Sequence, residues 1–241
     1  MTGRVGEREH RYFARYYDRI TQVAERRWLG AVRDRLVGDL GGQVLEIGAG
    51  TGANLPHYRG AARVVAAEPD RAMRHYLRQR LDQAQVPVEI SAASGEDLPF
   101  PDASFDAVVS TLVLCSVDDL DRTLAEVRRV LKPTGRFVFC EHARAPGVRG
   151  RIQDLLTPLW RRLGAGCHPN RRIRAAIERA GLVIRDIETF CPRLNFPVTV
   201  PMIRGVAVPR GGRAAQASTS GGRVRGGRSR SESWRRRRLQ P

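Results

Sequence analysis

Three alternate glycines form the most informative segment of the chain, because they directly follow a short apolar run. The segment reads VLEIGAGTG, with glycines at positions 48, 50 and 52. Backbone without side chains can approach a ligand closely, and we expect that a Cβ at Gly48 or Gly50 would occupy the ligand's place. Glu68 follows the next apolar run, twenty residues after Gly48. A carboxylate there can accept both ribose hydroxyls, so the pattern predicts a nucleoside site.

The glycines alone leave the cofactor open. Gly48, Gly50 and Ala53 also satisfy the looser G-x-G-x-x-G/A pattern of dinucleotide sites. A nucleotide-dependent oxidoreductase is therefore one interpretation, and an ordinary tight turn without function is another.

The elements that must position this loop alternate along the chain. Helical spacing of apolar residues over 9–38 predicts an N-terminal helical cap. Helices are also expected at 70–81, 118–131, 149–163 and 171–180, and strands at 44–47, 63–67, 86–90, 105–110, 136–141, 182–187 and 198–208. The segment Lys132-Pro133-Thr134-Gly135 is expected to form a turn that ends the helix at 118–131. This order predicts an α/β fold, Rossmann-like, with a seven-stranded mostly parallel sheet and helices on both faces.

Four motifs then appear in a fixed order between residues 43 and 142. They read VLEIGAGTGANL, AAEPDRAM, GEDLPFPDASFDAVVSTLVLCSV and LAEVRRVLKPTGRFVFCEH. In this order they resemble the small-molecule branch of the class I methyltransferases that use S-adenosylmethionine (SAM). The resemblance implies methyl transfer from SAM to a small-molecule acceptor.

The resemblance also implies roles for individual residues. The glycine loop would wrap the methionine part of SAM, Glu68 would bind its ribose, and Ser94-Gly95-Glu96 would lie along its adenine. Many relatives carry Asp where Ser94 stands, so adenine contacts are expected to fall to backbone groups or to Glu96. Tyr17, in the pair Tyr17-Asp18, would lie over the cofactor or pack against the core. The predicted cofactor-binding residues are Tyr17, Glu46, Gly48, Ala49, Gly50, Thr51, Gly52, Glu68, Pro69, Ser94, Gly95, Glu96 and Thr111.

A narrower resemblance concerns the acceptor. Glu141-His142, Trp160 and Gly166-Cys167-His168 are similar to segments in bacterial relatives of the animal alkyl-thiol methyltransferases. This favours a thiol acceptor, with oxygen or carbon methylation of a phenol or quinone precursor as the alternative. His142 and His168 are the candidate general bases, and each could instead be structural.

The cysteines give little indication of their role. Cys115 is expected at the mouth of the sheet, as a buried residue or as part of the acceptor pocket, and Cys140 in the core. The four cysteines lie at least 24 residues apart without a C-x-x-C pair, so their spacing predicts neither a metal site nor a disulfide framework. No apolar stretch is long enough for a transmembrane segment, and we expect a cytoplasmic protein.

Charge is concentrated at the carboxyl terminus. The formal net charge is +17, and residues 210–241 hold ten arginines and one glutamate with almost nothing apolar. We therefore expect a methyltransferase domain over 1–209 and a disordered tail over 210–241. Such a tail could associate non-specifically with nucleic acid or an anionic surface. The sequence does not indicate the oligomeric state.

Overall fold

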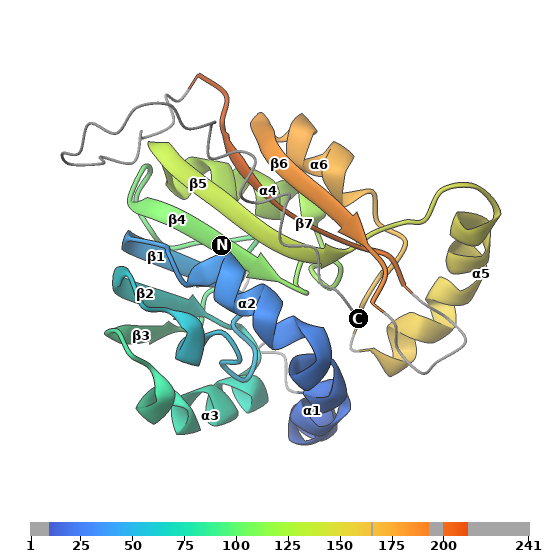
Figure 1. Ribbon diagram of the computed structural model, residues 1–241, viewed down its shortest axis with the longest axis horizontal. Coiled ribbons are helices and arrows are strands. Elements are labelled where there is room, and N and C mark those ends of the chain that lie inside the picture. Colours follow the sequence, from blue (N-terminus) through green and yellow to red (C-terminus); the bar gives the residue numbers. More distant parts are fainter. Residues whose placement is uncertain (1–9, 165, 193–199, 212–241) are drawn as a thin grey trace, which may run out of the picture.

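A seven-stranded sheet forms the centre of the computed structural model, which describes residues 10–164, 166–192 and 200–211. The strand order is β3-β2-β1-β4-β5-β7-β6. The first five strands in this order pair in parallel, and β7 runs antiparallel to both β5 and β6. Figure 1 shows helices on both sides of this sheet. The predicted Rossmann-like, mostly parallel sheet is thereby confirmed.

Most strands are longer than their predicted runs, whereas the third is one residue shorter and the seventh begins later. They are β1 Gly42–Ile47, β2 Ala61–Ala67, β3 Val88–Ser91, β4 Phe105–Thr111, β5 Leu131–His142, β6 Leu182–Phe190 and β7 Met202–Pro209. The start of β5 differs from the expected turn at 132–135, because Leu131 already pairs with Phe105 and a register shift takes up the extra residues. The predicted strand over 198–208 begins partly outside the described residues.

Two layers of helices cover the sheet. The helices are α1 Arg11–Ala24, α2 Gly30–Val37, α3 Arg71–Gln79, α4 Leu120–Val130, α5 Gly147–Leu163 and α6 Ile173–Arg179, with short helical turns η2 Leu55–His57 and η3 Leu81–Gln83. Helices α4 and α6 bury their apolar residues on one face of the sheet. Helices α2 and α3 pack on the other face. Both faces of the central strands are therefore buried, as their nearly continuous apolar sequences require.

The expected N-terminal helical cap is present. Helix α1 continues into α2 through η1 Glu25–Leu29, one wide π-type turn. Leu29 and Val32 anchor this part of the cap in the core, whereas Tyr12 and Ile20 on α1 are exposed. Figure 1 shows α1 and α5 on the side of the molecule to which the parallel strands point. Ligand sites of open α/β sheets lie at this carboxyl edge.

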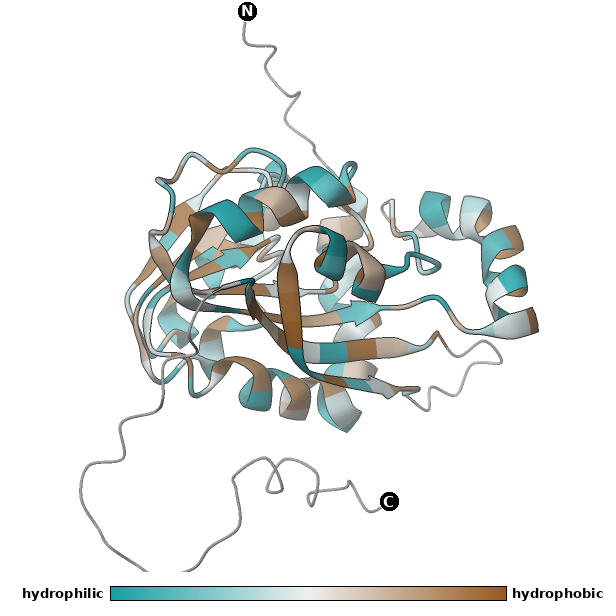
Figure 2. Ribbon diagram, turned by 90° about the horizontal axis from the view of Figure 1, so that it is seen from above, coloured by the Kyte–Doolittle hydropathy of each residue, from teal (hydrophilic) through white to brown (hydrophobic). Residues whose placement is uncertain are grey.

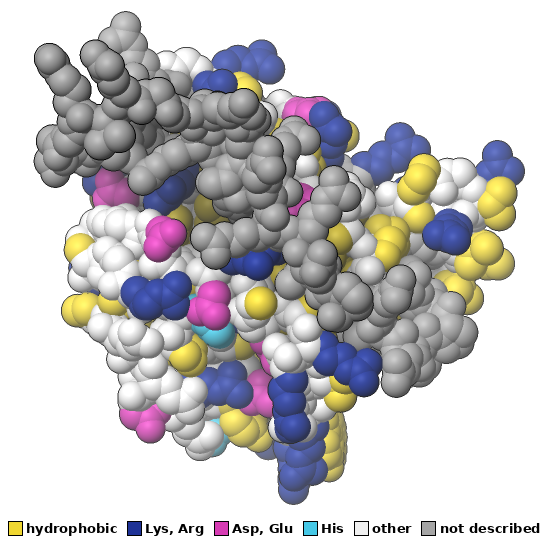
Figure 3. Space-filling view, viewed as in Figure 1, with side chains coloured by type: hydrophobic (Ala, Val, Ile, Leu, Met, Phe, Trp, Pro, Cys, Tyr) yellow, Lys and Arg dark blue, Asp and Glu magenta, His cyan; other side chains and the backbone are white. Residues whose placement is uncertain are grey.

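Helix α5 stands apart from the two layers. It exposes large apolar residues, which are Val148, Ile152, Leu155, Leu156 and Leu159. In Figure 2 α5 projects from the body of the molecule, and in Figure 3 hydrophobic side chains and arginines alternate over it. No helix in the described part of the chain is long and apolar enough to span a bilayer.

Candidate functional site

The glycine loop follows β1 at the carboxyl edge of the sheet. Gly48, Gly50 and Gly52 all have positive φ, at 57°, 59° and 85°, a region that residues with a Cβ adopt only at a cost. A Cβ on Gly48 would lie 2.5 Å from a methyl group of Val113, so packing by itself requires a glycine here, and its role as a cofactor ligand stays a prediction. A Cβ on Gly50 would meet only the Gly48 carbonyl oxygen, at 4.0 Å. Gly50 therefore faces the open side of the loop.

Glu68 lies directly beyond β2 and next to this loop. Its Oε2 accepts a hydrogen bond from the Gly50 amide at 2.8 Å, and its Oε1 accepts one from the Asp70 amide at 2.8 Å. Burial raises the pKa of Glu68, although these two amide bonds work against the shift. The carboxylate is held in one orientation, and each oxygen keeps a lone pair for another donor. The structure thus brings together the two predicted halves of a nucleoside site.

Glu46 supports the loop from within the core. Asn54 and Tyr58 each donate a hydrogen bond of 2.8 Å to one of its carboxylate oxygens. Arg33 in turn donates to the Asn54 side-chain oxygen at 2.7 Å. Burial raises the pKa of Glu46 to about 7. Both carboxylate oxygens of Glu46, a predicted cofactor ligand, thus have protein partners. Through Asn54 and Tyr58 they fix the segment that follows the glycine loop.

Helix α1 is tied to the loop by an ionic hydrogen-bond network. Thr51 donates to one oxygen of Asp18 at 2.8 Å, and Arg80 donates to the other at 2.5 Å. Tyr17 lies beside this contact, and burial raises its pKa to about 12. The structure thus places the Tyr17-Asp18 pair against the glycine loop through the contacts of Asp18.

The other predicted positions lie around the same edge. The Ser94 hydroxyl donates to Glu96, whose other carboxylate oxygen accepts the Asp118 amide at 2.8 Å. Thr111 at the end of β4 accepts a hydrogen bond from Asn54 at 3.2 Å. The Pro69 carbonyl accepts one from Arg74. Ala49, Gly52 and Gly95 also lie in the loops at this edge. As cofactor ligands, all of them stay predictions.

The segment after β4 is held in an unusual conformation. Leu112 has a φ of +62°, which is costly for a side chain of its size and is found most often at functional sites. Glu141 stabilises this turn, because its Oε1 accepts from the Ser110 hydroxyl at 2.6 Å and from the Val113 amide at 3.0 Å. Arg171 donates to the carbonyls of Leu114 at 2.6 Å and of Val117 at 2.7 Å. Two charged side chains thereby fix the backbone on both sides of Cys115.

Cys115, His142 and Cys167 converge at this position. Their sulfur and nitrogen atoms all lie within 4.8 Å of one another, and Cys167 Sγ lies 3.5 Å from His142 Nδ1. A hydrogen bond with Cys115 lowers the pKa of Cys167, and the same contact together with burial raises that of Cys115. Burial lowers the pKa of His142, but Cys115 and Glu141 raise it by more. Sequence spacing missed this cluster, because its members come from three distant segments.

His168 lies outside the cluster. Its Nδ1 is 3.3 Å from the Cys115 carbonyl oxygen, which can only accept, so Nδ1 carries the proton and Nε2 is the basic atom. Burial lowers the pKa of His168, and Arg171 and Arg161 lower it further. Of the two candidate bases, His142 is thus beside the thiols and His168 beside the backbone. Cys140 is fully buried in β5, as expected for a core residue.

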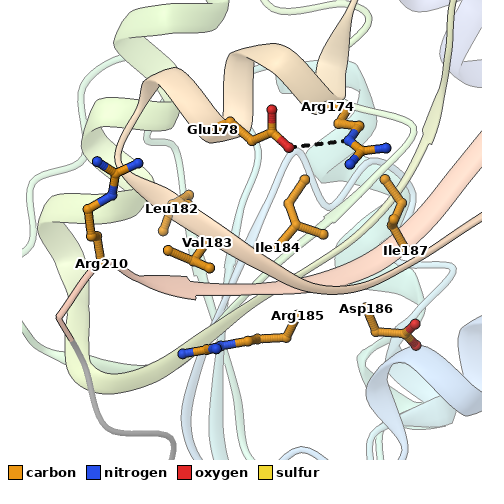
Figure 4. A pocket seen from close by; sticks show the side chains of 9 residues that line it. All are labelled: Arg174, Glu178, Leu182, Val183, Ile184, Arg185, Asp186, Ile187 and Arg210. Carbon is orange, nitrogen blue, oxygen red and sulfur yellow. Dashed lines mark hydrogen bonds and ion pairs between the residues drawn. The ribbon is translucent and has the colours of Figure 1, made fainter.

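A separate pocket lies between α6 and β6 (Figure 4). Its lining includes Arg174 and Glu178, which form an ion pair of 3.2 Å, together with Arg185, Asp186 and Arg210. None of the predicted site residues lines it. Its charged side chains are partnered or solvated on an edge strand, and we assign it no role.

Comparison with known proteins identifies relatives for most of the described chain. Residues 45–139 match the family model of a methyltransferase domain. The thiol S-methyltransferase TMT1B of Rattus norvegicus is 36% identical over 170 residues, which cover 68% of this chain and 70% of the relative. A demethylmenaquinone methyltransferase of Thermobifida fusca is 35% identical over 156 residues, or 62% of each chain.

A solved structure shares the fold at low sequence identity. The crystal structure of a SAM-dependent methyltransferase from Aquifex aeolicus is similar with a TM-score of 0.58 and 14% identity. The match covers 83% of this chain and all of that one.

Proposed function

The chain belongs to the class I SAM-dependent methyltransferases, and on this premise we propose that it methylates a small thiol at the carboxyl edge of β1, β4 and β5. The observation that carries the proposal is the hydrogen bond from the Gly50 amide to Glu68. It joins a loop open at Gly50 to a fixed carboxylate, which is the arrangement that a ribose and its neighbouring groups require.

The residues present fit SAM. Gly50 leaves room for a close approach, the free lone pairs of Glu68 suit the two ribose hydroxyls, and the turn of Ser94 to Glu96 lies after the next strand for the adenine. SAM bound there supplies an electrophilic methyl group on a positively charged sulfur. The family match favours SAM over the dinucleotide that the glycines alone allowed.

The chain's own residues orient and desolvate the acceptor. Thr51 and Arg80 hold α1 against the loop through Asp18, and Arg171 and Glu141 hold the turn that carries Cys115. Most of the acceleration in a direct methyl displacement comes from aligning two reactants in a dry site. A thiol needs less help than a phenol, because it ionises near neutral pH.

The thiol preference is supported by the relatives and by the site. The rat relative is a thiol S-methyltransferase, and the Thermobifida fusca relative acts on demethylmenaquinone, so a quinol is the second candidate. The region beyond β4 and β5 offers the buried sulfur atoms of Cys115 and Cys167 together with His142, which suit a soft acceptor. Whether His142 or His168 acts as a base for any acceptor stays a prediction.

Calorimetric titration with SAM tests the cofactor site. Glu68→Gln keeps the shape of the side chain and removes its charge, so the ribose hydroxyls lose a charged acceptor. A loss of about 1.5–3 kcal/mol, or roughly 10- to 150-fold in affinity, is expected. Glu178→Gln, an exposed substitution on α6, is the matched control and should bind SAM as the wild type does. Equal affinity of both variants would place the ribose elsewhere.

The arginine-rich segment 210–241 lies outside the described residues except for 210 and 211. Its expected disorder, its dispensability for catalysis and its non-specific association with nucleic acid or anionic surfaces stay predictions. Removing 212–241 should leave SAM affinity and turnover unchanged, as measured by calorimetry and methyl transfer.

A further inference from the structure

The cluster of Cys115, His142 and Cys167 combines ligand types that bind soft divalent cations. Cys115 follows β4, His142 is the last residue of β5, and Cys167 lies in the loop after α5. Both cysteines are almost completely buried, at 1% and 7% exposure. Buried thiols and an imidazole within 4.8 Å of one another are a donor set typical of zinc.

The spacing of these atoms suits tetrahedral coordination. Zn–S bonds of about 2.3 Å and Zn–N bonds of about 2.0–2.1 Å at the tetrahedral angle place S and N about 3.6 Å apart. Cys167 Sγ and His142 Nδ1 are separated by 3.5 Å. Cys115 Sγ lies within 4.8 Å of both atoms, whereas two zinc-bound sulfurs lie about 3.8 Å apart. A small side-chain rotation therefore suffices to close the site.

A buried oxygen beside His142 lacks a partner. Glu141 precedes His142 and is fully buried, and its Oε2 has no hydrogen-bond partner among the described residues. Its Oε1 and the guanidinium of Arg171 hold the backbone around Cys115. An unpaired buried oxygen is rare in native structures, and a bound ion or water nearby is one explanation of it.

We propose that Cys115, His142 and Cys167 bind one Zn²⁺ ion and that its fourth position receives the acceptor thiol. The acceptor part of this inference rests on the proposed function, whereas the metal site does not. Three protein ligands and an open position are typical of catalytic zinc. Cys115 and His142 lie at the carboxyl ends of β4 and β5, the same edge of the sheet at which the glycine loop follows β1.

The metal would activate the acceptor thiol by favouring its deprotonated form, as it does for the ligands Cys115 and Cys167. The acceptor thiol loses its proton to water as its sulfur binds zinc. That sulfur then forms the new bond to the methyl carbon, and the electron pair of the broken sulfonium bond remains with the departing sulfur. The methylated product is a neutral thioether, a weak ligand that leaves the metal.

Metal titration of the full chain tests the site without any acceptor. Protein freed of metal by a chelator and fully reduced should bind one Co²⁺ per chain with the visible absorption of tetrahedral thiolate coordination, and one Zn²⁺ should displace it. Cys115→Ser, Cys167→Ser and His142→Ala should each lower zinc affinity at least about 100-fold, more than loss of an outer-shell partner does. Cys191→Ser, at the exposed cysteine, is the control and should bind like the wild type.

The outcomes separate the metal site from its alternatives. No stoichiometric metal binding by the reduced wild type, or binding that survives all three substitutions in variants with native circular dichroism, would overturn the proposal. The protein as isolated could instead show two fewer titratable thiols than the reduced protein. If only a reductant restores them, and if Cys115→Ser shows no such loss, Cys115 and Cys167 form a disulfide. That result would also overturn the proposal.

Activity gives an independent second readout. Removing the metal should abolish transfer to thiols and leave SAM affinity unchanged, and zinc should restore transfer. Undiminished thiol methylation by metal-free protein would refute the role of zinc while leaving the proposed function intact. Absence of thiol methylation by zinc-loaded protein would refute the proposed function, and the metal site would then be judged by the titration alone.

Discussion

The two halves of the sheet's carboxyl edge are built differently. On the side of β1 and β2, the glycine loop and Glu68 come from one continuous stretch of about twenty residues, and backbone amides hold the carboxylate. On the side of β4 and β5, Cys115, His142 and Cys167 come from three segments, and the buried side chains of Glu141 and Arg171 hold the backbone. The first half depends on local geometry and the second on tertiary contacts.

This difference predicts how each half fails when a residue is changed. A substitution in the glycine loop should act through backbone strain and space. A substitution beyond β4 should act through the loss of a long-range contact, and it should spare the cofactor half.

The largest effect is expected from a pair of matched substitutions in the loop. Gly48→Ala and Gly50→Ala impose the same strain, because both glycines have φ near +58°, at a cost of about 1–2 kcal/mol each. Only the Cβ at position 48 would clash with Val113, so Gly48→Ala should lower the free energy of unfolding by at least about 1 kcal/mol more than Gly50→Ala.

Denaturant unfolding and calorimetry with SAM measure both properties. Gly50→Ala should weaken SAM binding more than its modest effect on stability suggests, because its Cβ enters the open side of the loop. Equal destabilisation by the two variants would contradict the role assigned to Val113.

The next effect concerns the acceptor half. Arg171→Lys keeps the positive charge but cannot bridge two carbonyls with one planar group. Losing one hydrogen bond to a charged group costs about 1.5–3 kcal/mol, so kcat/KM for the acceptor should fall roughly 10- to 150-fold. SAM affinity should change less than about twofold. The control is Arg174→Lys on α6, whose arginine forms an exposed ion pair with Glu178.

A weaker effect is expected in the pH dependence of stability. Burial raises the pKa of Glu46 from an ordinary 4.5 to about 7, so the folded state binds this proton more tightly than the unfolded chain. Between about pH 4.5 and 7 its contribution to the free energy of unfolding therefore falls as pH rises, by up to about 1.4 kcal/mol per pH unit. Glu46→Gln should therefore make the slope of the free energy of unfolding against pH less negative in this range.

Denaturant unfolding at several pH values measures the slope. Glu89→Gln, at an exposed position on β3, should leave the slope as in the wild type. A slope in Glu46→Gln identical to that of the wild type would mean that Glu46 does not titrate in this range.

The same contrast explains what could be predicted from the sequence. The strands and the cofactor segments were predictable, because apolar runs and glycine spacing are local signals. The packing role of Gly48 was not predictable, since Val113 is far away in the sequence and its contact could not be anticipated. The start of β5 was missed because pairing of Leu131 with Phe105 overrides the turn signal of Pro133.

The acceptor half was not predictable in the same way. Cys115 and Cys167 are separated by one strand and two helices, and no short spacing motif brings them together. His142 was noted as a possible base but not as a neighbour of both thiols. Only the fold places these three residues side by side.

The central claim is methylation of a thiol at this edge, and a matched pair of acceptors tests it most directly. The full chain is given methyl-labelled SAM with thiophenol or phenol, which differ only in the reacting atom, and with a demethylated quinol. We predict labelled thioether from thiophenol, at a rate that rises with pH until the thiol's own pKa is passed, and little or no labelled phenol ether. Labelled quinol without any labelled thioether would contradict the account.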